Sequence, residues 1–272
     1  MSNNSSQGGL MSALRSVFTL GAMIIALIVS ILLFKFVMGN PINFEGNNPH
    51  GTPLPGNYLG IIYKGGIIVP LLMTVNLILI IFSIERLITL PRASGKGRIG
   101  VFVKHLQNLL DNNKIEDAIV ACDKQKGSLA NVMKAGLIRY RTLQDDKTLV
   151  KDQKILALQK EFEEASALEL PMLSRNLVIL STIASISVLI GLLGTVLGMI
   201  RAFGALAQAG SPDALALATG ISEALINTAF GITGSLLAIV LYNTFSTQID
   251  SFTYKIDEAG FSLVQSFAAS TK

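Results

Sequence analysis

One long apolar stretch, residues 177–207, reads LVILSTIASISVLIGLLGTVLGMIRAFGALA and contains a single charged residue, Arg201. The wider region from Asn176 to Ile249 adds only two further charges, Asp213 and Glu223. Apolar runs of about 18 residues or more are typical of membrane-spanning helices. The sequence therefore predicts a membrane protein and argues against a soluble enzyme.

The composition supports this prediction. Half of the 272 residues are hydrophobic and 15% are charged, with a mean hydropathy of +0.54, whereas a soluble domain carries about 25% charged residues. The single cysteine, Cys122, and two distant histidines, His50 and His105, provide no metal-binding or catalytic cluster. We expect no cofactor and no enzymatic activity. The net charge of +4 reflects membrane orientation and not binding of nucleic acid.

Four apolar segments are long enough to cross a bilayer. The predicted spans are residues 17–38, 65–90, 176–207 and 215–246. A signal peptide is the competing interpretation of the first span, but no small-x-small cleavage site follows it. The remaining segments are a disordered N-terminus (1–16), a periplasmic connection (39–64), a cytoplasmic helical domain (91–175), a periplasmic turn (208–214) and a cytoplasmic C-terminal helix (247–272).

The placement of lysine and arginine predicts the orientation. Basic residues lie at both membrane edges of the 91–175 segment, at Arg92, Lys96, Arg98 and Arg175, and such an excess marks the cytoplasmic side. Four spans then place both termini in the cytoplasm. The third span is longer than a bilayer requires, so we expect helices that project into the cytoplasm.

Several local features add expectations about the helix ends. Prolines are expected to exclude regular structure from residues 39–57, and Pro171 to kink or break the helix predicted over residues 147–170. Ser211 is suited to cap the helix of the fourth span. At the cytoplasmic end of the second span, we expect Glu85 and Arg86 to form an ion pair.

The third and fourth spans each present a face of small and polar residues when placed on an ideal helix. The two faces consist of Ala184, Ser187, Gly191, Gly194, Thr195, Gly198, Ala202 and Ala205, and of Gly220, Glu223, Ala224, Asn227, Thr228, Gly231, Gly234, Ser235 and Ala238. Small residues allow helix backbones to approach closely in lipid. We therefore assign to helix packing Gly191, Gly194, Gly198, Gly231 and Gly234.

Glu223 indicates a function beyond packing. It lies about eight residues into the fourth span, and at roughly 12 Å depth an ionisable group costs about 3 kcal/mol and usually faces protein or water. With Asn227, Thr228 and Thr195 it supplies polar groups for a proton route, and we expect these faces to meet other subunits or an inserted partner helix. The alternative is a carboxylate near the outer interface, or hydrogen-bonded to a neighbouring helix, without a role in transport.

Two motifs resemble those of the ExbB/TolQ/MotA proton-channel family. Residues 191–200, GLLGTVLGMI, are similar to the family's GLFGTVxGI element, and residues 220–231, GISEALINTAFG, to its GIAEALxxTAxG element. The ERL at 85–87 and the YN at 242–243 match two further positions. The resemblance extends from about Gly65 to the end of the chain and is greatest to ExbB.

This resemblance implies a bacterial inner-membrane protein that forms a pentameric bundle around two copies of a single-span partner, ExbD, whose membrane aspartate carries protons. Such a complex uses proton-motive force to act on TonB, which energises outer-membrane transport. Thr195 and Thr228 match the family's pore-facing threonines, and Glu223 matches its membrane glutamate. The span at 17–38 is extra relative to the three-span form, and Leu237 stands where many members have proline.

Two other interpretations stay open. The first is a TolQ-type or MotA-type stator subunit of another proton-driven motor, although the short outer loop and modest cytoplasmic segment favour ExbB or TolQ over MotA. The second is a structural membrane scaffold that does not conduct, in which Glu223 and Thr228 would tolerate apolar replacement. The predicted fold class is in each case an all-α, polytopic membrane protein with four transmembrane helices.

Overall fold

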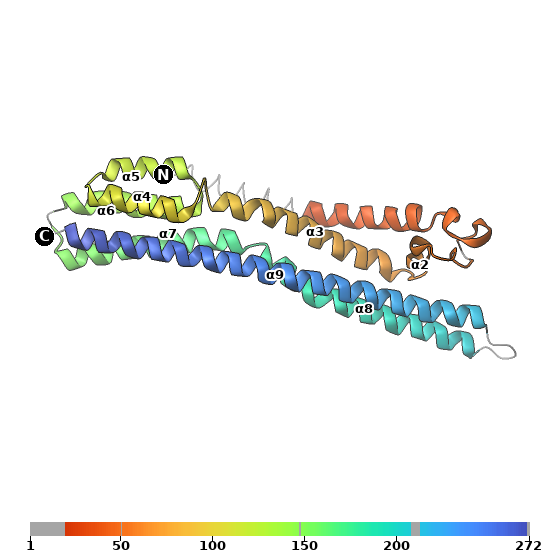
Figure 1. Ribbon diagram of the computed structural model, residues 1–272. Coiled ribbons are helices and arrows are strands. Elements are labelled where there is room, and N and C mark those ends of the chain that lie inside the picture. Colours follow the sequence, from red (N-terminus) through yellow and green to blue (C-terminus); the bar gives the residue numbers. More distant parts are fainter. Residues whose placement is uncertain (1–19, 50, 147, 208–212, 271–272) are drawn as a thin grey trace. The chain divides into compact units, whose positions relative to one another are not determined.

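Helices account for the regular structure of this protein. The computed structural model describes residues 20–49, 51–146, 148–207 and 213–270, and within these ranges the β-structure amounts to one isolated bridge between Phe44 and Pro53 (Figure 1). The prediction of an all-α protein is confirmed. In chain order the main helices are Leu20–Met38, which ends in the π-helical turn η1 (Leu33–Met38), α2 (Tyr58–Tyr63), α3 (Ile68–Ala93), α4 (Ile99–Asp111), α5 (Ile115–Gln125), α6 (Ser128–Asp145), α7 (Lys151–Ser174), α8 (Leu177–Leu206) and α9 (Ala214–Ser270).

Four helical stretches of the described chain are long and apolar enough to cross a membrane. They are Leu20–Met38, Ile68–Ala93, Lys151–Leu206 and Ala214–Ala269. A bilayer core of about 30 Å is crossed by about 20 helical residues, so the 57 residues of α9 exceed what one crossing needs. The prediction of four membrane-spanning candidates is confirmed. The segments 1–16 and 208–212, for which we expected disorder and a turn, lie outside the described residues.

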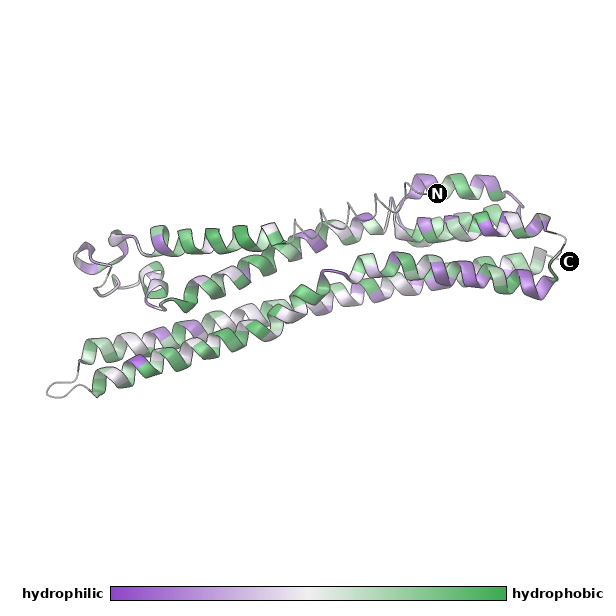
Figure 2. Ribbon diagram, turned by 180° about the vertical axis from the view of Figure 1, so that it is seen from behind, coloured by the Kyte–Doolittle hydropathy of each residue, from purple (hydrophilic) through white to green (hydrophobic). Residues whose placement is uncertain are grey.

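The described residues form two units. Unit 1 comprises those up to Ser83 together with Ile179–Tyr242, and unit 2 comprises Ile84–Val178 together with those from Asn243 onward. Hydrophobic residues predominate along the helices of unit 1, whereas hydrophilic residues gather on those of unit 2 (Figure 2). Leu225 in unit 1, for example, is 67% exposed in the single chain. Surface of this kind is suited to lipid or to another protein surface.

Unit 2 has an apolar core of its own. Helices α4, α5, α6 and α7 contribute to this core together with the C-terminal part of α9. Gly136 of α6 lies so close to α7 that a Cβ there would overlap the ring of Phe162. Tyr140 meets Phe267 edge to face, with ring centroids 4.6 Å apart. The amphipathic helices of the polar segment therefore bury their apolar faces against one another, as soluble helices do.

Two local features differ from the sequence-based expectations. Pro171 lies inside α7, which continues to Ser174, and the helical hydrogen bonding is interrupted only at residues 175–176. The proline-rich connection 39–57 contains two single 3-10 turns, η2 (Pro41–Asn43) and η3 (Glu45–Asn47). Proline fits the first position of such a turn, and Pro41 occupies that position in η2.

The N-terminus of α9 is capped by Asp213. Its Oδ1 accepts hydrogen bonds from the backbone N–H groups of Leu215 and Ala216, each at 3.0 Å. Asp213 therefore satisfies two of the N–H groups that have no partner within a helix, the role expected of a capping residue. Ser211, which we expected in this role, lies outside the described residues.

Candidate functional site

Helices α8 and α9 of unit 1 lie side by side with their backbones in contact (Figure 1). We call this contact the helix seam; it is lined by the glycines of both helices. A Cβ on Gly191 would lie 3.0 Å from the Cα of Gly231, and a Cβ on Gly198 would lie 2.7 Å from the backbone nitrogen of Ala224. Only glycine leaves room for such an approach, which gains packing contacts in lipid.

At the two other glycines of the predicted packing set, side chains of neighbouring helices pack against the glycine backbone. A Cβ on Gly194 would lie 2.5 Å from the Cβ of Asn227, and one on Gly234 would lie 2.5 Å from Ser187 Oγ and 2.7 Å from Asn76 Oδ1 of α3. The small-residue faces of α8 and α9 thus contact each other within one chain. Our expectation, that these faces meet other subunits or an inserted partner helix, did not include this contact within the chain.

Thr195 of α8 and Thr228 of α9 come together at the edge of the seam. Their hydroxyl groups are in direct contact. Each hydroxyl also lies near a backbone carbonyl, Thr195 Oγ1 at 3.2 Å from the oxygen of Gly191 and Thr228 Oγ1 at 3.2 Å from that of Ala224. Both residues are only half-buried in the single chain. The pair therefore presents polar groups to whatever lies beside this edge.

Glu223 lies five residues before Thr228 on α9 and is buried, at 3% exposure. Its carboxylate is paired with Arg201 of α8, whose Nη1 lies 2.6 Å from both Oε1 and Oε2. Sequence reasoning missed this pair, because Arg201 figured there only as the single charged residue of the stretch 177–207. The sequence did contain a signal for this ion pair. Arg201 and Glu223 carry opposite charges in two spans that otherwise contain no charged residue.

A turn before α3 closes the site from the side. Gly66 has a positive φ of 75°, and a Cβ there would overlap Oε1 of Glu223. The preceding residue, Gly65, accepts a hydrogen bond at 2.9 Å from Nδ2 of Asn227, which is fully buried. Glu223 and Asn227 therefore face the start of α3 and not the exterior of unit 1. Nothing in the sequence pattern indicated this glycine turn as part of the site.

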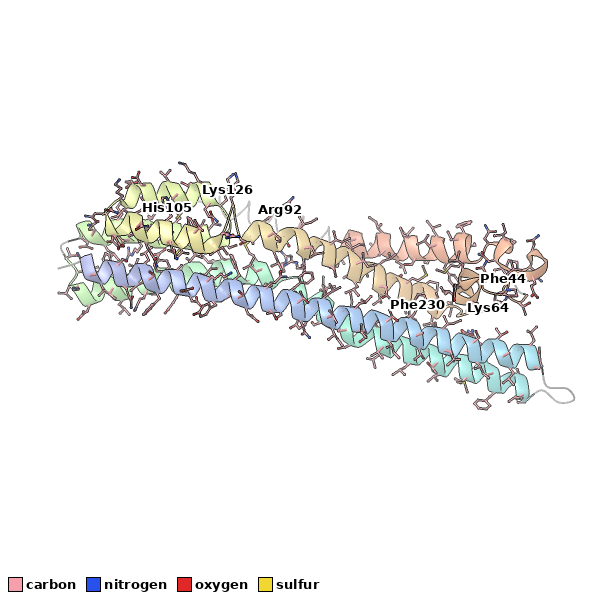
Figure 3. The ribbon with its side chains drawn as sticks, in the orientation of Figure 1. Phe44, Lys64, Arg92, His105, Lys126 and Phe230 are labelled. Carbon is pink, nitrogen blue, oxygen red and sulfur yellow. The ribbon has the colours of Figure 1, made fainter. Side chains whose placement is uncertain are left out.

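Glu223 and Arg201 also line a cavity, which we call the loop-end cavity because the connection before α3 forms its other wall. It has a volume of about 710 Å³ and is lined by residues 51–56, Ile61, Lys64, Arg201, Asp213, residues 215–216, residues 218–220, Ser222 and Glu223. Near this cavity Lys64 Nζ lies 5.5 Å from the ring centroid of Phe44 (Figure 3). Burial lowers the pKa of Lys64.

The predicted ion pair between Glu85 and Arg86 is present in unit 2. Arg86 Nε lies 2.7 Å from Glu85 Oε2, and Nη2 lies 2.8 Å from Oε1. Arg86 Nη1 donates to the carbonyl of Leu173 at 2.7 Å, and Asn176 donates to Glu85 at 3.1 Å. The pair therefore joins α3 to the junction of α7 and α8.

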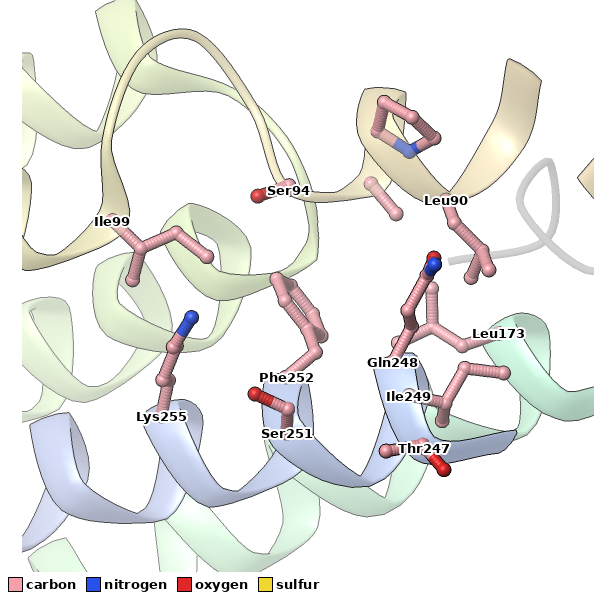
Figure 4. A pocket seen from close by; sticks show the side chains of 12 residues that line it. Leu90, Ser94, Ile99, Leu173, Thr247, Gln248, Ile249, Ser251, Phe252 and Lys255 are labelled. Atoms are coloured by element: carbon pink, nitrogen blue, oxygen red, sulfur yellow. The ribbon is translucent and has the colours of Figure 1, made fainter. Parts of the chain in front are cut away.

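A second cavity lies near this pair in unit 2 (Figure 4). It has a volume of about 470 Å³, and Leu173 and Phe252 are among its lining residues. Lys255 is the one charged side chain in the set that lines it. The cavity lacks the combination of opposed charges and hydroxyl groups that unit 1 gathers around Glu223, which makes the unit 1 site the stronger candidate for chemistry.

Comparison with known proteins agrees with this choice. Residues 124–258 match the model of the MotA/TolQ/ExbB proton channel family, and this range includes Thr195, Arg201, Glu223 and Thr228. Members of that family are proton channels or transport-energising subunits and do not belong to a known class of enzymes.

Individual relatives match over different lengths. The chain is 42% identical to the biopolymer transport protein ExbB of Salmonella typhimurium over 73 residues, which are 27% of this chain and 30% of that protein. It is 27% identical to the Tol-Pal system protein TolQ of Haemophilus influenzae over 199 residues, 72% of this chain and 86% of that protein. It is 35% identical to ExbB of Helicobacter pylori over 96 residues, 35% of this chain and 66% of that protein. The chain thus spans about a third of the Salmonella relative's length.

Proposed function

Because this chain belongs to the MotA/TolQ/ExbB proton channel family, whose members are bacterial inner-membrane proteins that work with partner proteins, we propose that it is an ExbB-like motor subunit. With an ExbD-like single-span partner, it uses proton-motive force to energise a TonB-like protein and so outer-membrane transport. The observation that carries this proposal is the buried Glu223, five residues before Thr228 of the hydroxyl pair Thr195 and Thr228.

The packing of the seam limits where a proton can pass. Between Gly191 and Gly231 the two backbones touch, so there is no space for water along the seam itself. Thr195 and Thr228 are half-buried and keep one side open. A proton route therefore needs a second wall beside these hydroxyls, supplied by another copy of the chain or by a partner helix. This supports an oligomer, for which the family resemblance suggests a pentamer.

The energy available to such a device is sufficient for mechanical work. Moving one charge through 100 mV releases about 2.3 kcal/mol, so a few protons per cycle can shift a partner protein. In the proposed topology both termini and the 91–175 segment are cytoplasmic, and the loop-end cavity opens to the periplasm. Protons then enter from the side on which their electrochemical potential is higher.

A TolQ-type role is the second candidate. The longest of the alignments above is with TolQ, whereas the alignment of highest identity is with ExbB. We favour the ExbB-like role because the sequence identity to the Salmonella ExbB, 42%, is higher than the 27% identity to TolQ. A TolQ-type protein would have the same proton-handling site and a different partner, so the distinction concerns the cargo and not the chemistry.

The deciding experiment is complementation with the neighbouring partner gene included. The pair is expected to restore TonB-dependent uptake in bacteria that lack ExbB and ExbD, and a Glu223→Ala pair that assembles normally is expected to restore none. Rescue of cells lacking TolQ and TolR, without rescue of TonB-dependent uptake, would establish the second candidate. Mass measurement of the purified complex counts the copies of each subunit.

A further inference from the structure

The two members of the Arg201–Glu223 ion pair differ in their contact with solvent. The side chain of Glu223 is 4% exposed, whereas that of Arg201 is 54% exposed. Both residues line the loop-end cavity, but Arg201 presents far more of its side chain than Glu223 does. A buried carboxylate is stable in its ionised form only when an opposite charge lies next to it. Arg201 supplies that charge, at 2.6 Å from both oxygens.

Approach to the carboxylate is restricted on its other sides. The turn at Gly66 presses against Oε1, and the seam at Gly198 holds the backbones of α8 and α9 in contact. The cavity is the side on which Glu223 adjoins open space. Its other charged lining residues are Lys64, whose Nζ donates to the carbonyl of Pro49 at 3.2 Å, and Asp213, which caps α9. Both members of the pair line this space, and Arg201 is the more exposed of the two.

We propose, building on the function proposed above, that Arg201 is a displaceable counter-ion that controls access of protons to Glu223 from the loop-end cavity. In the paired state the carboxylate is ionised and the guanidinium neutralises it. When a hydronium ion in the cavity transfers its proton to Glu223, water is left, the acid becomes neutral, and Arg201 keeps its own charge and moves into the cavity. Release of the proton to the next carrier restores the pair.

The asymmetry of exposure makes this exchange feasible. Arg201 already lines the cavity, with 54% of its side chain exposed in the single chain, so an outward movement keeps its guanidinium in contact with the cavity. The cavity is also lined by the carboxylate of Asp213, which offers the displaced guanidinium an opposite charge. Arg201 is in this scheme a positioning residue, since it acts through Glu223 and does not itself carry the proton.

Infrared spectroscopy of the purified full-length protein tests the ionisation directly. Arg201→Gln removes the counter-ion, and the variant is expected to gain a carboxylic-acid C=O band at neutral pH. The band should disappear in the double variant Arg201→Gln/Glu223→Gln and should be absent from Arg201→Lys, which keeps the charge. A spectrum in which Arg201→Gln shows no such band would overturn the proposal, because Glu223 would then stay ionised without Arg201.

Proton-driven activity provides the second measurement. Arg201→Gln is expected to lower activity at neutral pH by at least about tenfold, with recovery as the pH rises and Glu223 can release its proton again, whereas Arg201→Lys retains most of the activity. A loss in Arg201→Gln that persists unchanged across the pH range would contradict the counter-ion role. If Glu223→Gln itself keeps full activity, the proposed function fails, while loss in Glu223→Gln with none in Arg201→Gln refutes only the role of Arg201.

Discussion

The Cα atoms of Gly191 and Gly231 face each other across α8 and α9, so that a Cβ added to Gly231 would lie 2.8 Å from the Cα of Gly191. A helix pair in lipid gains stability from this approach, since lipid and leucine side chains are equally apolar and only closer packing distinguishes the associated state. The glycine contact therefore sets how near Thr195 comes to Thr228 one turn away, and with it the geometry of the candidate site.

The glycine contact predicts an unusual response to alanine. Gly231→Ala adds a methyl group where no space exists, and we expect a loss of about 1–3 kcal/mol in the free energy of unfolding from overpacking. Gly204→Ala, also within α8, is the matched control, because nothing lies within 4 Å of its Cβ position. There the better helix propensity of alanine should leave stability unchanged or raise it by up to about 1 kcal/mol. Thermal unfolding in detergent measures both, and equal destabilisation of the two variants would contradict the seam.

The hydroxyl pair predicts loss of activity without loss of structure. Valine has the shape of threonine without its hydroxyl, so Thr195→Val and Thr228→Val remove the polar contact and leave most of the packing intact. We expect proton-driven uptake to fall by at least about tenfold while the amount of assembled complex stays normal. Thr233→Val serves as the control, since Thr233 lies on the same helix, is exposed, and bonds only to the carbonyl of Ala229 among the contacts described. Full uptake in the two test variants would favour a scaffold that does not conduct.

Gly66 offers a test of the turn that holds Glu223. Gly66→Ala introduces a Cβ that overlaps Oε1 of Glu223 and also strains a residue with a φ of +75°. Gly46→Ala introduces the same kind of strain at a φ of +65°, meets nothing within 4 Å and does not line the loop-end cavity. Both variants are expected to lose some stability, of the order of 1 kcal/mol, from the backbone conformation. Only Gly66→Ala should lose proton-driven activity, and a similar loss in Gly46→Ala would show that strain in the connection, not contact with Glu223, is responsible.

Cys122 predicts a chemical property of unit 2. Burial raises the pKa of its thiol from 9.0 to about 12, so the thiol stays protonated through neutral and mildly alkaline pH. Because the thiolate is the reactive form, alkylation in the folded protein is expected to be slower than in the unfolded chain by a factor of roughly 1,000. The chain contains no other cysteine, so mass spectrometry of total alkylation follows this residue alone. Comparable rates in native and denatured protein would mean that the core around α5 is open.

Much of the fold could be predicted from local sequence. The apolar runs are long enough to identify four spans, and the soluble character of the residues around 99–145 follows from amphipathic spacing. The faces of α8 and α9 were also recognised, since residues three and four apart lie on one side of a helix. This reasoning failed at Pro171, which lies inside α7. At the start of α9 it favoured Ser211 as the cap, whereas Asp213 accepts the capping hydrogen bonds.

The site itself could be predicted only in part. Thr195, Glu223 and Thr228 stood out because polar residues are rare in an apolar span. The direction in which they face did not follow from that rarity, since a helical wheel shows which residues share a side and not what lies opposite. We expected the small faces to meet other subunits or an inserted partner helix, and the contact between α8 and α9 within one chain was not foreseen.

The periodicity and length of apolar segments are thus sufficient to predict the helices, the membrane spans and the faces of each helix. Each of these features depends only on residues that are close in sequence, within one turn for a face and within about 20 residues for a span. The partners of the buried acid and amide depend on packing instead. Arg201 is 22 positions from Glu223, and Gly65 is 162 positions from Asn227. Contacts at such separations exist only after helices dock side by side, since docking selects one rotation of each helix from the several that its sequence allows.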